Sequence, residues 1–277
     1  MSDELCAVAI MAKASIAGAV KTRLVPPLTP EEAAELNSSF LADVAANIAR
    51  AATQVPIQGF AAYHPLGSER FFADLLPDSF ELLAPKEPTI GRSLVHATCD
   101  LLAAGYRSVC LVNADSPTLP TGVLVDAVRR LQEPGDRVVL GPAADGGYYL
   151  IGLKCFHQRL FEAIDWSTDR VYRQTIMRAE EISLPVAALA EWYDVDDEAT
   201  LAVLARELLA GPNAVGGYRW GYAAPSTAGF LARLAATNGK VRRLLDASPN
   251  PTADPGRSPL PFEPVKNPPP PILSSPR

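Results

Sequence analysis

Residues 5–24 read LCAVAIMAKASIAGAVKTRL, an apolar run that continues directly into a loop of small and basic residues. The first seven residues of this stretch are all apolar, which is typical of a strand that is buried on both faces of a sheet. The loop that follows carries Lys13, Lys21 and Arg23. Ligands bind at the carboxyl ends of the strands in an open parallel sheet, so we expect this loop to lie at a binding site.

Strands and helices are predicted to alternate along the rest of the chain. Thr29-Pro30-Glu31-Glu32 combines a Thr cap, a Pro at the first helical position and a Glu three residues after the cap, which predicts a helix start. Further strands are expected at 55–62, 80–83, 108–113, 136–140 and 184–188, and helices at 30–52, 93–104, 121–131, 169–180, 197–210 and 226–245. This order predicts an α/β fold with a mostly parallel mixed sheet and helices on both faces.

The prolines divide the chain into two parts. Of the 26 prolines in 277 residues, 11 lie in the last 30 residues. Segments that are rich in Pro and polar residues bury too little apolar surface to order themselves. We therefore expect one folded domain over residues 1–245 and a Pro-rich disordered tail over residues 246–277.

Composition excludes several classes of protein. The net charge of −6 argues against nucleic-acid binding, which needs a basic surface, and the apolar runs are too short to span a membrane. The first residues, MSDELCAVAIMAK, contain acids where a secretory signal needs basic residues. The four cysteines stand apart, and three lie in apolar runs, so we expect buried, reduced thiols in a cytoplasmic protein. The oligomeric state is not predicted.

The basic loop is a candidate phosphate site. Lys13, Lys21 and Arg23 supply three positive charges, and Gly18 among small residues allows a ligand to approach the backbone. The loop contains neither a P-loop nor a GxGxxG motif. A solvated basic loop is therefore an equally supported interpretation.

Two acidic segments suggest a metal site. Asp115, in NADSPTLP, directly follows the strand at 108–113, where a carboxylate could hold Mg²⁺ against substrate phosphates. Asp194 and Asp196, in YDVDD, point to the same side of an extended chain and could complete an oxygen-ligand site for Mg²⁺ or Mn²⁺. The alternatives are a cap for the helix at 121–131 and an acidic helix N-terminus, a role that suits Asp197.

Asp145-Gly146-Gly147 forms the fourth candidate. Two glycines at the edge of a strand commonly form a turn or a bulge, and composition alone favours that interpretation. The glycines would also admit a ligand to the backbone N–H groups, with Asp145 available to a sugar or acceptor hydroxyl.

Together these segments resemble a known family. AKASIAGAVKTRL, NADSPTLP, GPAADGGYYLIGL, Trp166-Ser167-Thr168 and YDVDDEATL occur in the order seen in the bacterial DUF2064 glycosyltransferase-like family. That family belongs to the GT-A, or nucleotide-diphospho-sugar transferase, superfamily, and is more distantly similar to the phospholactate and molybdenum-cofactor guanylyltransferases. The resemblance covers roughly residues 6 to 235.

The resemblance implies a role for each matching residue. Lys13, Lys21 and Arg23 would hold nucleotide phosphates, Asp115 and Asp196 would bind the metal, and Asp194 is a neighbouring candidate ligand. Gly146 and Gly147 would line the acceptor or sugar pocket, with Trp166, Ser167 and Thr168 at its rim.

The chain departs from the family pattern around the expected site for the nucleotide base. Ser15 and Ala17 replace prolines, Glu87 and Pro88 stand where a Gln-Gly pair is common, and Ser93 replaces an Arg, with Arg92 adjacent.

The leading hypothesis is a metal-dependent nucleotidyltransferase that moves a nucleotidyl group from a nucleoside triphosphate to a small phosphorylated acceptor and releases pyrophosphate. Catalysis would rest on positioning and on charge stabilisation by Lys21, Arg23 and a metal ion on Asp115. The alternatives are a glycosyltransferase that uses a nucleotide-sugar, with Asp145 as base, and a non-catalytic nucleotide-binding module.

Overall fold

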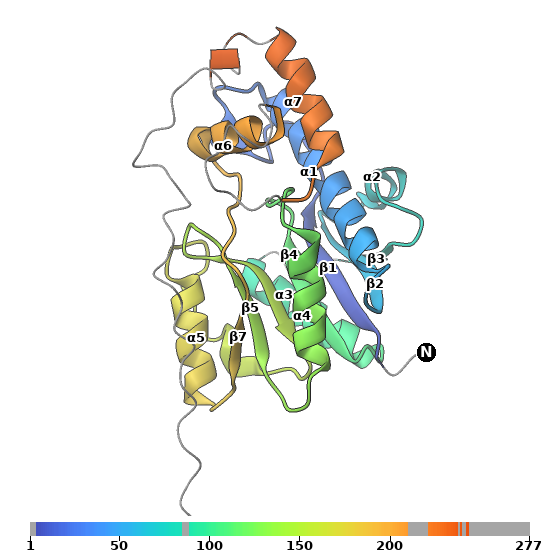
Figure 1. Ribbon diagram of the computed structural model, residues 1–277, viewed down its shortest axis with the longest axis vertical. Coiled ribbons are helices and arrows are strands. Elements are labelled where there is room, and N and C mark those ends of the chain that lie inside the picture. Colours follow the sequence, from blue (N-terminus) through green and yellow to red (C-terminus); the bar gives the residue numbers. More distant parts are fainter. Residues whose placement is uncertain (1–3, 85–88, 210–220, 238, 240–241, 244–277) are drawn as a thin grey trace, which may run out of the picture. The chain divides into compact units, whose positions relative to one another are not determined.

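The computed structural model describes residues 4–84, 89–209, 221–237, 239 and 242–243 (Figure 1). The predicted tail at 246–277 lies outside the described residues, so the domain boundary near residue 245 remains a prediction. No helix in the described part of the chain is long and apolar enough to cross a membrane.

One seven-stranded sheet forms the centre of the fold. Its strands are β1 (Cys6–Lys13), β2 (Ile57–His64), β3 (Glu81–Leu83), β4 (Ser108–Asn113), β5 (Val138–Pro142), β6 (Tyr148–Leu153) and β7 (Val186–Ala188). They lie in the order β3-β2-β1-β4-β6-β5-β7, and β6 alone runs antiparallel to its neighbours. The predicted mostly parallel mixed sheet is confirmed.

Helices cover both faces of this sheet. They are α1 (Pro30–Ala51), α2 (Glu69–Leu75), α3 (Ile90–Ala103), α4 (Thr121–Gln132), α5 (Val171–Glu181), α6 (Glu198–Leu209) and α7 (Pro225–Thr237), with short 3-10 helices at Thr22–Leu24 and Gln158–Phe161. One buried core lies between the sheet and the helices α1 and α4, and it continues beyond the sheet to α7, which packs on α1, and to α6, which packs on α7. A second core lies under α3 and α5 (Figure 1).

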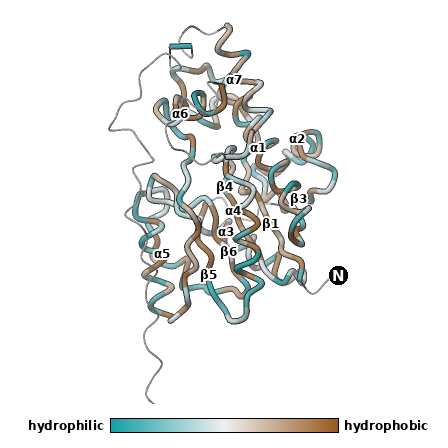
Figure 2. Tube along the Cα trace, viewed as in Figure 1, coloured by the Kyte–Doolittle hydropathy of each residue, from teal (hydrophilic) through white to brown (hydrophobic). Residues whose placement is uncertain are grey.

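The alternation of side chains along β1 explains the two cores. Cys6, Val8 and Ile10 belong to the first core, whereas Ala7 and Ala9 belong to the second. A strand with apolar residues on both faces has to be covered on both sides, as the hydrophobic colouring of the central strands illustrates (Figure 2).

Helix α1 begins where the sequence predicts. The Thr29 side chain accepts a hydrogen bond from the Glu32 backbone N–H, and the Glu32 carboxylate accepts one from the Thr29 N–H, which completes a capping box. Helix α2 was not predicted, because seven residues are too few to establish a helical periodicity.

The cysteine prediction needs a correction. All four are free, but only Cys6 and Cys110 are buried, while Cys99 is half-buried and Cys155 is exposed. Cys6 and Cys110 lie inside the sheet on β1 and β4, whereas the other two lie on a helix surface and in a loop, where apolar neighbours in sequence do not ensure burial.

Two buried polar residues of α1 attach distant parts of the chain. Asn47 donates to the Leu119 carbonyl at 2.6 Å and accepts from the Thr121 hydroxyl at 2.6 Å, which holds the connection between β4 and α4. The Asp43 carboxylate accepts the backbone N–H groups of Ser226 and Thr227 at 3.0 and 2.7 Å, which satisfies the N-terminus of α7.

Asp43→Ala is expected to lower the free energy of unfolding by about 3 kcal/mol, because two N–H groups at the N-terminus of α7, one of them buried, lose a charged acceptor. Urea denaturation followed by circular dichroism measures this change. Asp43→Asn keeps one acceptor oxygen and should cost clearly less. Equal stability of Asp43→Ala and the wild type would mean that the docking of α7 contributes little to the folded domain.

Candidate functional site

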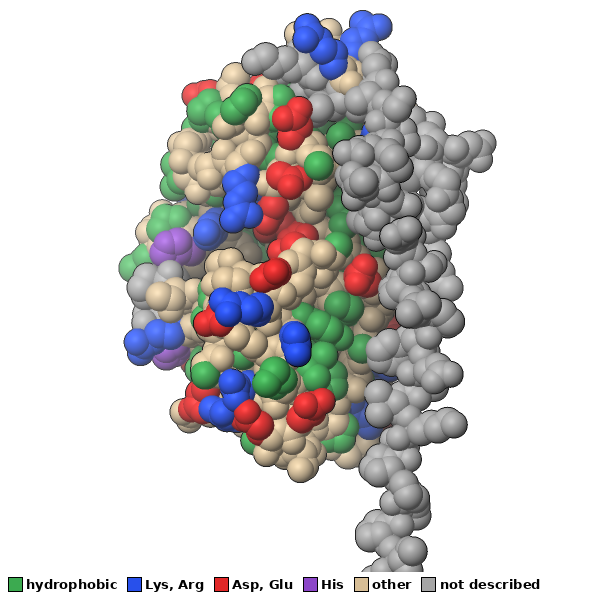
Figure 3. Space-filling model, turned by 90° about the vertical axis from the view of Figure 1, so that its left-hand side faces the viewer, with side chains coloured by type: hydrophobic (Ala, Val, Ile, Leu, Met, Phe, Trp, Pro, Cys, Tyr) green, Lys and Arg blue, Asp and Glu red, His purple; other side chains and the backbone are tan. Residues whose placement is uncertain are grey.

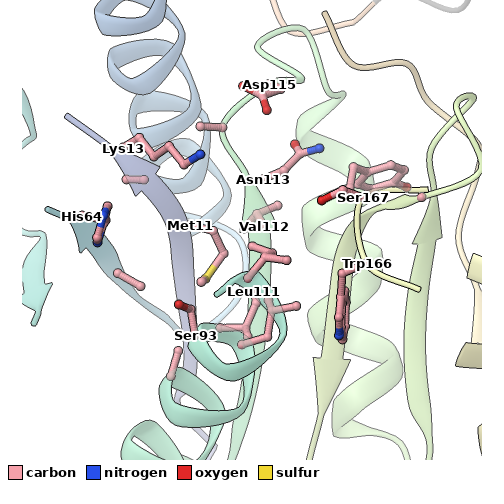
Figure 4. A pocket seen from close by; sticks show the side chains of 18 of the residues that line it. Met11, Lys13, His64, Ser93, Leu111, Val112, Asn113, Asp115, Trp166 and Ser167 are labelled. Atoms are coloured by element: carbon pink, nitrogen blue, oxygen red, sulfur yellow. The ribbon is translucent and has the colours of Figure 1, made fainter. Parts of the chain in front are cut away.

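The sheet has its topological switch point between β1 and β4. From β1 the chain continues to β2 on one side, and β4 lies on the other, so the loops after β1 and β4 leave the same edge of the sheet. A cleft of about 580 Å³ lies at this edge. Figure 4 shows Lys13 at the end of β1 and Asn113 and Asp115 at the end of β4, all on this cleft.

Lys21 joins the first loop to both predicted acidic segments. Its Nζ lies 2.5 Å from Asp115 Oδ1 and 3.2 Å from Asp196 Oδ1, and it donates to the Val195 carbonyl at 2.7 Å. The structure therefore brings together three residues that are far apart in the sequence and that were predicted to share one site.

The segment before α6 reaches Asp115 by following the end of β5. The Trp192 N–H donates to the Pro142 carbonyl at 3.1 Å, and the Ala144 N–H donates to the Trp192 carbonyl at 2.9 Å. The chain then crosses to the loop after β4, where the Val195 N–H donates to the Asp115 carbonyl at 2.9 Å. Backbone hydrogen bonds thus fix Asp196 beside Asp115.

Negative charge accumulates around this contact. Burial, together with the charges of Asp145 and Asp196, raises the pKa of Asp194 to about 7. Burial opposes the charged form of Lys21, but Asp115 and Asp196 outweigh it and raise the pKa of Lys21, which stays cationic. Asp194 forms no ion pair within the described residues, so its predicted role as a metal ligand remains a prediction.

The two other predicted cations are open to solvent. Lys13 is exposed at the end of β1, and the Arg23 side chain is 75% exposed with one nitrogen 3.9 Å from Asp196 Oδ2. Figure 3 shows other acidic side chains that lie next to Lys and Arg side chains on one face of the molecule, as Asp196 lies next to Arg23. Gly18 adopts φ +77° in an exposed part of the loop, but it does not line the cleft.

The Asp145–Gly147 segment is a turn, as composition favoured. Gly146 has φ +89°, a conformation that disfavours residues with a side chain, and a Cβ there would lie 2.2 Å from the Asp169 carbonyl oxygen. The Gly147 N–H donates to Asp145 Oδ1 at 2.8 Å, and the Tyr172 N–H donates to the Gly146 carbonyl at 3.0 Å. The turn is thereby packed against the loop that carries Trp166, Ser167 and Thr168.

Trp166, Ser167 and Thr168 line the cleft together with Asp145 and Gly147. The Trp166 indole lies against the backbone of Gly91, where a Cβ would be 2.4 Å from the indole nitrogen. Gly91 is therefore required for the close approach of α3 to this wall. Glu87 and Pro88, which depart from the family pattern, lie outside the described residues.

Several lining residues were not singled out from the sequence. They are Asn113 and Tyr148 on β4 and β6, and Ile90, Leu94 and Ala97 on α3, beside Ser93, which the family comparison had singled out. The α3 residues recur at helical spacing, but the sequence gives no sign of whether such a face covers a core or a cleft.

A buried hydrogen-bond network connects the segments that carry the acids. The Thr118 hydroxyl lies 3.2 Å from the Tyr193 hydroxyl and 3.2 Å from the Glu207 carboxylate, and the Tyr193 hydroxyl also donates to Glu207. This network joins the loop after β4, the YDVDD segment and α6, and it was not predicted.

The carboxylate oxygens of Asp115 and Asp196 are suitable ligands for a hard divalent cation that also binds a substrate. Within the described residues no three His, Cys, Asp or Glu side chains are grouped so that they could hold a metal ion. Mg²⁺, however, is usually held by one or two carboxylates together with water and substrate phosphates. Asp115 and Asp196 already direct two carboxylate oxygens at one cation, the Lys21 ammonium, so the residues fit such an ion.

Comparison with known proteins supports the predicted resemblance. The family model described as "Uncharacterized protein conserved in bacteria (DUF2064)" matches residues 47–168. A structure from Desulfovibrio desulfuricans G20, provisionally named a nucleotide-diphospho-sugar transferase, is 29% identical over 88% of this chain and 99% of its own, with a TM-score of 0.73. No curated protein matches the chain.

Two more distant structures have TM-scores below 0.5. A CMP:2-keto-3-deoxy-manno-octonic acid synthetase complexed with CTP is 11% identical over 74% of this chain and 100% of its own, with a TM-score of 0.48. Glucosyl-3-phosphoglycerate synthase from Mycobacterium tuberculosis, in complex with Mn²⁺ and UDP, is 10% identical over 69% of this chain and 71% of its own, with a TM-score of 0.44. The family match and the first structure confirm the DUF2064 resemblance and the fold.

Gly146→Ala is expected to destabilise the domain by about 3 kcal/mol, because the new Cβ meets both a left-handed backbone and the Asp169 carbonyl. Thermal and urea unfolding measure the loss. Gly147→Ala is the matched control and should cost under about 1 kcal/mol, since its nearest neighbour is the movable Asp145 side chain. Similar costs for the two variants would contradict the role given to Gly146.

Glu207→Gln should change how stability depends on pH. Burial raises the pKa of Glu207 despite the hydrogen bonds from Tyr193 and Thr118, so the folded protein binds a proton more tightly than the unfolded chain does. The wild type therefore loses stability as the pH rises from the ordinary Glu value of about 4.3 through the raised value. A glutamine side chain does not lose a proton in this range, so the variant lacks this loss of stability.

Urea unfolding between about pH 4 and pH 7 tests this sign. The stability of Glu207→Gln relative to the wild type should increase with pH over this interval. Glu180→Gln, on the exposed surface of α5, serves as the control for the loss of one carboxyl group. If the stability of Glu207→Gln relative to the wild type falls as the pH rises, the raised pKa assigned to Glu207 is wrong.

Proposed function

We propose that this chain is a metal-dependent nucleotidyltransferase that transfers a nucleotidyl group from a nucleoside triphosphate to a small phosphorylated acceptor. The fold and the 29% identical structure from Desulfovibrio desulfuricans support an assignment to the transferases with a nucleotide-dependent fold. The substrates and the reaction are the part that we propose.

One observation carries the proposal: cationic and anionic groups lie close together in the cleft at the switch point. Lys13 and Arg23 are exposed on one side, and Asp115 and Asp196 converge on the Lys21 ammonium beside them. A triphosphate needs positive charge along its length and a divalent cation that carboxylates help to hold. The apolar remainder of the cleft, with Leu94, Ala97 and Leu111, suits a flat ring.

The reaction needs no nucleophilic side chain. An oxygen of the acceptor phosphate attacks the α-phosphorus of the triphosphate, the bond from that phosphorus to the bridging oxygen breaks, and pyrophosphate leaves with the electron pair. The acceptor phosphate is already ionised at neutral pH, so no general base is required. Lys13 and Arg23 bind and orient the phosphates, which brings the reacting atoms into line.

A divalent cation on Asp115 and Asp196 would neutralise the charge that develops on the phosphates. The chain contributes the two carboxylates, the backbone hydrogen bond from Val195 that holds them together, and a cleft wall formed by α3 and Trp166. Asp194, with its raised pKa, adjoins this pair as a further acid.

A glycosyltransferase acting on a nucleotide-sugar is the second candidate, and the position of Asp145 favours it. Asp145 is exposed, lines the cleft and is held by the Gly147 N–H, as a base toward an acceptor hydroxyl would be. Incubation with Mg²⁺ or Mn²⁺, a panel of nucleoside triphosphates and phosphorylated acceptors, and separately with nucleotide-sugars, distinguishes the two. Pyrophosphate release supports nucleotidyl transfer, and nucleoside diphosphate release from a nucleotide-sugar would refute it. Nucleotide binding without turnover would instead identify a non-catalytic module.

Asp115→Ala is expected to weaken metal-dependent nucleotide binding by more than about 100-fold, because it removes a carboxylate that would hold the cation. Titration calorimetry with a nucleoside triphosphate, with and without Mg²⁺, measures the effect. Asp74→Ala, an exposed acid on α2, is the control for the loss of one negative charge. Unchanged affinity in Asp115→Ala would remove this residue from the site.

A further inference from the structure

All hydrogen-bonding capacity of the Lys21 side chain is taken up by this chain itself. Its ammonium has three hydrogens and lies within 3.2 Å of three oxygens, which belong to Asp115, Val195 and Asp196. Its side chain is 5% exposed, and Nζ lies 5.3 Å from the centre of the Phe40 ring. In this arrangement Lys21 has no hydrogen left to donate to a phosphate.

The oxygens that hold Lys21 are those that a divalent cation would use. Asp115 Oδ1 and Asp196 Oδ1 both point at Nζ. A divalent cation shared by the same two oxygens would come within a few ångströms of the buried ammonium, where the two positive charges repel each other. The two cations therefore compete for one place.

We infer that Lys21 is an internal cation that occupies the Asp115–Asp196 pair in the nucleotide-free protein and keeps a divalent cation out of it. A triphosphate offers oxygens that can replace the carboxylates as acceptors for Nζ, so that nucleotide binding frees the acid pair for the metal. This inference rests on the proposed function only in taking the acid pair as the metal site. It assigns the order of events, with metal binding dependent on the nucleotide.

The loop around Lys21 is built so that it can release the ammonium. Lys21 itself adopts φ +48°, a left-handed conformation that is unfavourable for a residue with a side chain. Backbone hydrogen bonds of residues 16–24 are local, as between the Ala19 N–H and the Ile16 carbonyl and between the Leu24 N–H and the Lys21 carbonyl. The buried side chains of Val20 and Leu24 keep the loop attached on either side when the Lys21 contacts are broken.

Lys13 provides a matched control within the same cleft. Its side chain is exposed, and it makes no ion pair with any residue that the structure describes. Lys13→Met and Lys21→Met change the net charge equally, so a general electrostatic effect on cation binding appears in both variants.

The test is Mn²⁺ binding to the full chain without nucleotide, measured by calorimetry and by electron paramagnetic resonance of free Mn²⁺. If Lys21 occupies the acid pair more than about nine-tenths of the time, removing it raises the Mn²⁺ affinity at least about tenfold. We expect this gain in Lys21→Met and a change of less than about threefold in Lys13→Met. Lys21→Gln keeps hydrogen-bond donors without the charge, and should show the same gain if Lys21→Met folds poorly.

Stability gives a second measurement. Lys21→Met leaves two acids without their cation, so Mn²⁺ should raise its melting temperature more than that of the wild type. Equal Mn²⁺ affinity in the wild type and both Lys21 variants would overturn the inference, as would an absence of Mn²⁺ binding in all of them. Pyrophosphate release by the wild type is measured separately. A negative result in the Mn²⁺ experiment does not contradict nucleotidyl transfer, and an absence of pyrophosphate release does not contradict a tenfold gain in Mn²⁺ affinity.

Discussion

The parallel pairing of β1 with both β2 and β4 is the constraint on which the rest of this structure depends. Because β1 and β4 are parallel, the loops that follow them leave the same edge of the sheet, and because the chain continues from β1 to β2 on the other side, a crevice forms at this point. The basic loop and Asp115 meet there. The segment that carries Asp196 is then attached by backbone hydrogen bonds to the ends of β4 and β5.

Charge balance at that edge sets a second constraint. Asp115 and Asp196 are held close together by the backbone, so their mutual repulsion has to be offset by a cation, and Lys21 offsets it in this structure. The same side chain therefore links three distant segments and stabilises the arrangement of the acids. Under the proposed function, Lys21 would have to exchange these partners for phosphate oxygens when a nucleotide binds.

Much of the fold follows from local signals in the sequence. The apolar run of β1, the capping box at Thr29 and Glu32, and the apolar strand that ends at Asn113 each depend on a few adjacent residues, and each was predicted close to its observed place. Helix α2 is too short to leave such a signal.

Contacts between distant residues could not be predicted in the same way. The spacing of the acids predicted which residues could share a site, but neither the pairing of Lys21 with Asp115 nor the Thr118–Glu207 network has any local signature. The cleft wall on α3 has the periodicity of an ordinary core face. The α3 wall lies close to Trp166 because Gly91 has no side chain. The sequence does not show that Gly91 and Trp166 are in contact, so this requirement could not be predicted from it.

The two ends of the sheet differ from its centre in a way that affects the behaviour of the molecule in solution. Strands β3 and β7 form the edges, and each is three residues long, whereas β1 and β2 at the interior have eight residues each. An edge strand exposes unpaired N–H and C=O groups to which another chain can add a strand, and short edges limit that reaction. The architecture thus places long, apolar strands where they are covered, and protects the protein against growth into aggregates by strand addition.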